Sequence, residues 1–119
     1  MEDESKTNTF TIIPDAIMTS QEINTNQKLI LAYLLRQAVY NQSNRFQLSS
    51  QRIIEHTGLE SKESVCRYTR VLVSKGFIKK ELDKNDKGVI TKYILDIPKI
   101  EETFGFDFKK IFCNNVQKQ

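Results

Sequence analysis

The sequence is short of the residue types from which metal, cofactor and disulfide sites are built. Its 119 residues include two cysteines, one histidine, four scattered glycines and no tryptophan. Cys66, Cys113 and His56 are too few and too widely spaced for a structural zinc site, and two thiols do not predict a disulfide scaffold. There is no glycine-rich phosphate loop, and no nucleophile has a recognisable catalytic base. These absences predict a protein that is not an enzyme and that takes no cofactor or metal.

Long hydrophobic runs are absent as well. The longest extends from Leu29 to Leu35, far short of the roughly 20 residues that span a bilayer. The N-terminal MEDESKTNTF is acidic and polar, unlike a secretory signal. We therefore expect no membrane association and a cytoplasmic location. This length predicts one domain over residues 10–98, with a disordered tail at 1–9 and an amphipathic segment at 99–119.

Charge is present but unevenly distributed. The chain has a net charge of +3, from 18 basic and 15 acidic residues. The segment from Ser61 to Lys92 holds nine of the basic residues and four of the acidic ones, a net +5, whereas the rest of the chain sums to −2. Such a basic segment is typical of a nucleic-acid-binding surface, and a solvated lysine-rich face is the alternative.

Hydrophobic spacing predicts the elements of the N-terminal half. Phe10 to Ile13 has the pattern of a short strand that ends at Pro14. From Gln27 the spacing becomes helical, after the N-cap residue types Asn24 and Thr25. This helix is expected to bury Leu31, Leu34, Leu35 and Ala38, to leave Lys28, Arg36 and Gln37 to water, and to end in the polar turn 41–44. Residues 46–48 then alternate like a short strand.

Caps and turn formers mark the elements of the C-terminal half. Ser49 or Ser50 begins a helix of about two turns that ends at Gly58. Ser61 begins a longer helix that ends before Gly76 and is expected to bury Val65, Thr69 and Leu72. The stretches 77–82 and 89–96 favour β-structure and flank the turn-forming residues 83–88, which predicts a β-hairpin with a charged tip. The expected fold is α+β, mainly α-helical with a small β-hairpin.

The order of these elements, together with SSQRIIEHTGLESKESVCRYTRVLVSKGFIKK, resembles the winged helix-turn-helix family of DNA-binding proteins. Residues 57–59 match the turn of the family pattern, Ser61 matches the start of the recognition helix, and residues 75–78 match its end. The opening segment, 10–35, looks like that of helix-turn-helix proteins from phages and plasmids. The resemblance implies a sequence-specific binder of double-stranded DNA from a mobile element, acting as a transcriptional regulator or as an accessory factor in replication or transfer. The alternative is a winged-helix adaptor or inhibitor that binds protein instead of DNA.

The expected DNA contacts follow from the face that the recognition helix turns outward. If Val65 and Thr69 face the core, Arg67 faces outward, where its planar fork can pair with both acceptors of a guanine. Arg70 is one turn further on and suits a phosphate, and Lys84 and Lys87 are expected at the tip of the hairpin, or wing. The full predicted interface is Ser50, Gln51, Arg52, Ser61, Lys62, Ser64, Arg67, Arg70, Lys84 and Lys87. A solvated surface is the alternative for its charged residues.

The C-terminal segment predicts an oligomer. Residues 100–112 contain four phenylalanines and two isoleucines, more apolar surface than a small soluble domain usually leaves exposed. We hypothesise that Phe104, Phe108, Ile111 and Phe112 join two chains across a two-fold axis, which would set two recognition helices roughly 34 Å apart on an inverted repeat. The alternative is that this segment packs on the first helix of its own chain.

Overall fold

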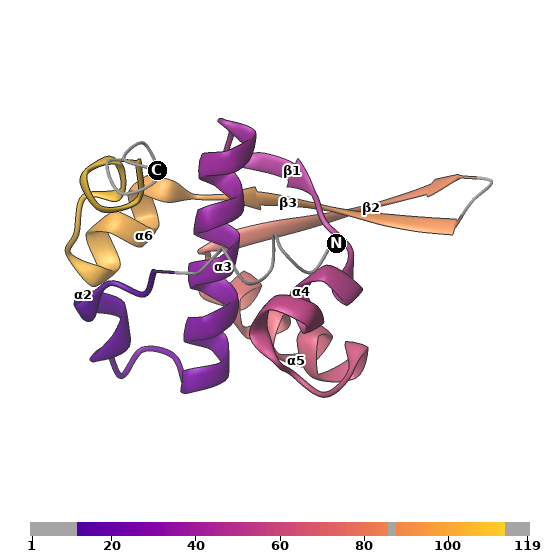
Figure 1. The fold of residues 1–119 in the computed structure, drawn as a ribbon, viewed down its shortest axis with the longest axis horizontal. Coiled ribbons are helices and arrows are strands. Elements are labelled where there is room, and N and C mark those ends of the chain that lie inside the picture. The colour runs from indigo at the N-terminus through magenta and orange to yellow at the C-terminus, as the bar shows by residue number, and fades with distance from the viewer. Residues whose placement is uncertain (1–11, 86–87, 114–119) are drawn as a thin grey trace, which may run out of the picture.

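A computed structural model describes residues 12–85 and 88–113. The helical elements are α2 (Asp15–Met18), α3 (Thr25–Asn41), α4 (Ser50–Thr57), α5 (Lys62–Ser74), α6 (Ile97–Phe104) and the π-helical turn η1 (Lys109–Cys113). The strands β1 (Arg45–Gln47), β2 (Ile78–Asn85) and β3 (Gly88–Leu95) form an antiparallel sheet in the order β1-β3-β2. Figure 1 shows α3 upright at the centre, the β2–β3 hairpin projecting to one side above α4 and α5, and α6 with η1 on the other side.

The central helix α3 begins where its sequence predicts. The Asn24 side chain accepts a hydrogen bond from the Gln27 amide at 2.9 Å, and the Gln27 side chain accepts one from the Asn24 amide at 2.8 Å. This reciprocal capping satisfies two N–H groups that the helix itself leaves unpaired. The helix ends at Gln42, which takes the left-handed conformation (φ 53°) in the predicted polar turn.

One prediction for α3 is wrong, because Arg36 is buried instead of exposed. Only 7% of Arg36 is accessible, and its guanidinium carbon lies 5.0 Å from the centre of the Tyr40 ring and 5.9 Å from that of Tyr33. Other elements surround α3 on most sides, so its polar positions are covered as well as its apolar stripe. The long methylene stem of an arginine tolerates such burial when aromatic faces receive its head group.

The helix-turn-helix forms as predicted from its caps. The Ser49 hydroxyl accepts from the Arg52 amide at 3.1 Å, and the Ser61 hydroxyl accepts from the Ser64 amide at 3.2 Å, so each serine begins a helix. Gly58 takes the left-handed conformation (φ 79°) that turns the chain from α4 into α5. Val65, Thr69 and Leu72 are all buried, which confirms the predicted inner face of α5.

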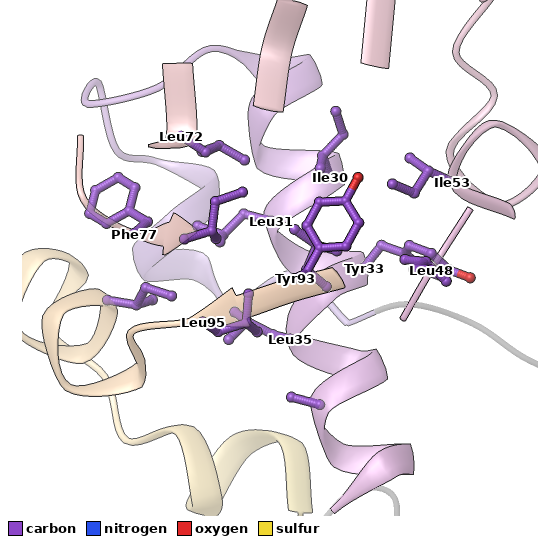
Figure 2. Close-up of a cluster of buried hydrophobic side chains, with 14 of the residues drawn as sticks. Ile30, Leu31, Tyr33, Leu35, Leu48, Ile53, Leu72, Phe77, Tyr93 and Leu95 are labelled. Atoms are coloured by element: carbon purple, nitrogen blue, oxygen red, sulfur yellow. The ribbon is translucent and has the colours of Figure 1, made fainter. Parts of the chain in front are cut away.

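The sheet packs against these helices through one face. Phe46 of β1 lies opposite Tyr93 of β3, and Ile78 of β2 lies opposite Leu95, and all four side chains are buried. Figure 2 shows Tyr93 pointing from β3 into a cluster with side chains of α3, α4 and α5, including Ile30, Ile53 and Leu72. Burial of these apolar side chains stabilises the fold, at about 1.5–3 kcal/mol for each fully buried large residue.

The structure corrects the predicted first strand. Ile12 and Ile13 belong to no strand, and the chain enters the short helix α2 directly after Pro14. A helix start suits proline, because the N–H group that proline lacks has no partner within the helix at that position. Phe10 and the predicted tail at 1–9 lie outside the described residues.

The hairpin also differs from its prediction, because its strands extend through most of the expected turn. Lys84 pairs with Val89, and Asn85 pairs with Gly88, so the strands leave only residues 86–87 between them. Lys84 is therefore a strand residue and does not lie at the tip. Lys87 falls outside the described residues. Gly88, the first residue of β3, has a φ of 127°, which residues with a side chain rarely adopt.

Much of the C-terminal segment is part of the core of its own chain. Ile100 is fully buried, and the ring of Phe104, a residue assigned to the predicted dimer contact, is buried with its centre 5.3 Å from that of Phe77. Phe108 and Ile111 are half-buried and pack against the same core, and η1 contacts α3. The side chain of Phe112 is not among those described. The homodimer itself stays a prediction.

A long helix, a short strand, two helices joined by a tight turn, and a hairpin that pairs with the first strand make up the winged helix-turn-helix architecture. The α+β fold class predicted from the sequence is confirmed. No helix within residues 12–85 and 88–113 is long and apolar enough to cross a membrane.

Candidate nucleic-acid interface

The outward face of α5 carries the residue expected to contact a base. Arg67 is exposed, and its guanidinium carbon lies 5.1 Å from the centre of the Tyr68 ring. The Tyr68 hydroxyl accepts a hydrogen bond from Asn26 at 2.9 Å, which ties α5 to the start of α3. Hydrogen bonding from Arg67, and then from Asn26, lowers the pKa of Tyr68. Tyr68 thus limits the rotamers of Arg67, while the residue as a whole stays exposed to solvent.

Arg70 lies one turn along the same helix and is also exposed. Its guanidinium is 3.8 Å from the sulfur of Cys66, which the structure places at the surface. Together with Arg67, it makes the outer side of α5 basic between positions 66 and 70. Glu63, exposed in the first turn, is the acidic residue on this side.

The side chains of the two serines predicted to contact DNA at the start of α5 take part in the N-terminal cap of the helix. The Ser61 and Ser64 hydroxyl oxygens are 3.2 Å apart, and both residues are half-buried. A hydroxyl still has a free acceptor site in such a pair, so contact with a ligand is possible only from the solvent side.

A groove of about 600 Å³ brings the predicted residues of α4 together with Lys62. Ser50, Gln51 and Arg52 line it from the first turn of α4, and Ile90 and Thr91 belong to β3. The amide groups of a first helical turn have no partners within the helix, and the helix dipole makes them attractive to anions. The groove therefore combines helix donors with the ammonium group of Lys62.

The hairpin adds a second set of cations, identified by strand alternation. Lys80, Leu82 and Lys84 share the face of β2 on which Ile78 is buried, so this face is on the helix side of the sheet. The ammonium group of Lys80 donates to the Thr69 hydroxyl at 3.1 Å. Leu82 is 64% exposed, and Lys84 is exposed beyond it.

Sequence reasoning missed Lys80. The available signal was its spacing of two from Ile78, which places both side chains on one face of a strand. The opposite face holds Lys79, Glu81, Asp83 and Lys92, and Lys92 pairs with Asp83 at 3.7 Å. The basic segment seen in the sequence is thus divided between two faces of the sheet.

A stacked pair of rings holds α4 against α3 behind the groove. His56, in the last turn of α4, stacks on Tyr33 with ring centres 5.0 Å apart and an angle of 15° between the planes. Burial raises the pKa of Tyr33, and the positive charge of Arg52 opposes that shift. Arg52 is thus near enough to α3 to affect the pKa of the buried Tyr33, although Arg52 itself is exposed.

Comparisons with known proteins support the fold. No family model matches the chain, and no curated protein matches it. A solved structure described as "N-Terminal domain of DNA binding protein" is similar, with a TM-score of 0.51 and 19% sequence identity over 88% of this chain and 93% of that chain. At this identity the likeness shows a shared fold that extends over almost the whole of both chains.

Proposed function

We propose that this chain is a non-enzymatic protein that binds double-stranded DNA in a sequence-specific manner. The observation that carries the proposal is that the helix-turn-helix and the hairpin that follows it carry three exposed cationic features. These are the outer side of α5 with Arg67, the groove at α4 with Lys62, and the helix-side face of the hairpin with Lys84. The similar structure described as a domain of a DNA-binding protein adds support.

In this proposal α5 enters the major groove, which is about 12 Å wide and accepts one helix. Arg67 contacts a guanine edge, because it is exposed and is guided by Tyr68. Arg70 contacts a phosphate. The first turn of α4 and Lys62 hold a flanking phosphate, and Lys84 reaches the neighbouring stretch of DNA backbone.

The finer proposal is a transcriptional regulator, or an accessory factor in replication or transfer, encoded by a plasmid or phage. It would act by occupying its site and so blocking or recruiting other proteins. The resemblance of the opening segment supports this origin. The position of the gene tests it, because a location among chromosomal housekeeping genes argues against a mobile element.

The central experiment measures binding to duplex DNA across a range of salt concentrations. Each neutralised phosphate contributes a slope of about −0.9 in the logarithm of affinity against the logarithm of salt. We expect a steep fall, with a slope that corresponds to several phosphates. A flat response would contradict the proposal and favour the protein-binding alternative.

Arg67→Ala tests the orientation of α5. We expect binding to weaken by roughly 1–3 kcal/mol at the preferred site, and the preference at one base pair to be lost. Selection of bound sequences from a random DNA pool measures this loss. Lys75→Ala, at the C-cap of the same helix, is the matched control. An unchanged selected sequence for Arg67→Ala would mean that another face of α5 contacts the bases.

A further inference from the structure

A second groove lies where β2 begins and β3 ends, away from the first turn of α4. It encloses about 460 Å³ and shares no lining residue with the groove at α4. Its apolar floor is lined by Val73, Ile94 and Pro98, together with Ile78 and Leu95, whose side chains are buried. Contributions thus come from the end of α5, both strands of the hairpin and the first turn of α6.

Two of these apolar residues are accessible to a partner. Val73 is 38% exposed although its neighbour Leu72 is completely buried. Ile94 is half-buried and lies on the outer face of the sheet, because Tyr93 and Leu95 on either side of it face the core. Exposed apolar surface gathered in a concave site is typical of a binding surface.

The rim of this groove is basic. Arg45 and Lys79 are the direct cross-strand partners of Ile94, one on each side, and both are exposed. Lys99 lies across Gly76, with its Cε atom 3.4 Å from the position that a Cβ would take there. Among the described residues no carboxylate forms a salt bridge with any of these three cations.

Asp96 is the acidic residue of the groove, and it is already engaged. Its carboxylate accepts a hydrogen bond from the Lys99 amide at 3.1 Å and so caps α6. The site therefore combines an apolar floor with an excess of positive charge at its edge.

We propose that this groove binds an acidic peptide segment of a partner protein. An apolar side chain of the segment packs between Val73 and Ile94, and carboxylates beside it pair with Arg45, Lys79 and Lys99. Complementary charge favours this occupant, and such pairing also raises the rate of association. The rim cations suit phosphates as well as carboxylates, but the apolar floor favours a peptide, because it accepts an apolar side chain and the DNA backbone has none.

The groove lies further along α5 than Arg67, the residue proposed to contact a base, although Arg70 is three residues before Val73 and so lies on a neighbouring part of the helix surface. Val73 follows Arg67 by six residues, which places it about 9 Å further along the helix axis and roughly a third of a turn around it. The inference goes beyond the proposed function and does not depend on it. If both hold, the domain binds DNA through the N-terminal part of α5 and a protein at the groove beyond its C-terminal end.

The test is a nuclear magnetic resonance titration of the full chain with a short synthetic peptide in which aspartates flank a Leu-Phe pair. We expect shifts at Val73, Lys79 and Ile94, and none at Arg67. A peptide with serine in place of Leu-Phe, and one with lysine in place of aspartate, should each bind at least about tenfold more weakly, a difference of about 1.4 kcal/mol.

Two variants on different elements keep the test independent of folding defects. Lys79→Glu and Val73→Ser should each weaken peptide binding about tenfold, while duplex DNA binding and the far-ultraviolet circular dichroism spectrum stay unchanged. Peptide affinity that survives both variants would overturn the inference.

Other occupants of the groove give different results, and each of them contradicts the proposal. If a DNA duplex shifts Ile94, and Lys79→Glu weakens DNA binding as much as Lys84→Glu does, the groove belongs to the DNA interface. If the chain self-associates in sedimentation and Val73→Ser abolishes that association, a second copy is the occupant. Failure of the peptide test leaves the salt-dependent DNA test unaffected, so the two proposals can fail separately.

Discussion

The two faces of the β2–β3 hairpin differ in how their charged residues are arranged. On the helix side, Lys80, Leu82 and Lys84 follow one another along β2 without a carboxylate between them. On the outer side, the acidic Glu81 and Asp83 follow Lys79, and Lys92 of β3 pairs with Asp83. Positive charge therefore accumulates on one face and is largely neutralised along the outer part of the other.

This difference shows why net charge along a sequence is a weak guide to a binding surface. Alternation along a strand divides a basic segment into two sets of residues, and only one set lies on the helix side of the sheet. The outer face regains an excess of positive charge only at its base, around Ile94, where the second groove lies.

The largest expected difference is in stability, between two adjacent residues of β3. Leu95 is completely buried on the helix side, so Leu95→Ala should lower the free energy of unfolding by about 2–5 kcal/mol. Ile94 is half-buried on the outer side, and Ile94→Ala should cost about 1 kcal/mol. Urea unfolding of both variants measures the difference. Equal losses would contradict the assignment of the two faces.

The raised pKa of Tyr93 predicts that the protein loses stability at high pH. Burial raises the pKa of Tyr93 from 10.0 to about 12, and the nearby thiol of Cys66 adds to the shift. Between these pH values the unfolded chain has lost the phenolic proton that the folded chain retains. The free energy of unfolding therefore keeps its full value below pH 10 and falls as the pH rises towards 12, by up to about 2–3 kcal/mol.

Denaturant unfolding between pH 8 and pH 12 measures this fall, in steps of roughly half a pH unit, with Tyr93→Phe as the control. The phenylalanine variant keeps the ring but has no proton to lose, so its profile should be flatter. Identical profiles would show that Tyr93 is not the residue responsible.

A pair of lysines compares the two faces in DNA binding. Lys84→Ala should reduce the salt slope by about 0.9, the contribution of one phosphate, and should weaken binding to all sequences alike. Lys92→Ala removes the same charge from the outer face and should leave both quantities unchanged. Fluorescence anisotropy with a labelled duplex at several salt concentrations measures the slopes. A smaller slope for Lys92→Ala would mean that DNA contacts the outer face.

The smallest expected effect is at Leu82. Because this side chain is 64% exposed, Leu82→Ala should change the free energy of unfolding by less than about 0.5 kcal/mol. It lies between two cations on the helix-side face, so contact with DNA should bury part of it, and affinity should fall roughly fourfold for each CH₂ group buried. Thermal unfolding measures the change in stability, and fluorescence anisotropy measures the change in DNA affinity. Unchanged DNA affinity would place Leu82 outside the contact.

Local signals predicted the helix-turn-helix well, because its determinants are close in sequence. Ser49, Ser61 and Gly58 act on backbone groups within a few residues, and the structure confirms each of them. The prediction of a first strand was wrong, because it too was based on neighbouring residues alone. The apolar spacing before Pro14 suggested a strand, but a strand requires a partner, and Ile12 and Ile13 have none in the described sheet.

The candidate interface could be predicted only in part. The helical spacing of α5 correctly placed Arg67 and Arg70 outward, because the buried positions Val65, Thr69 and Leu72 identify the inner face of the helix. Lys80 could have been found from its spacing of two from Ile78. The outer position of Lys92 required the register between the two strands of the hairpin, since a shift of one residue reverses which side chains face the helices.

By itself, the sequence determined where the helices of the helix-turn-helix begin and end, the inner face of α5 and the presence of a hairpin, because these depend on neighbouring residues. Only the tertiary structure decided that Arg36 is buried, that Phe104 completes the core of its own chain and that a groove with a basic rim forms around Ile94. Each of these depends on segments that are distant in sequence and meet only when the core is packed, and no local pattern records which surfaces that packing covers.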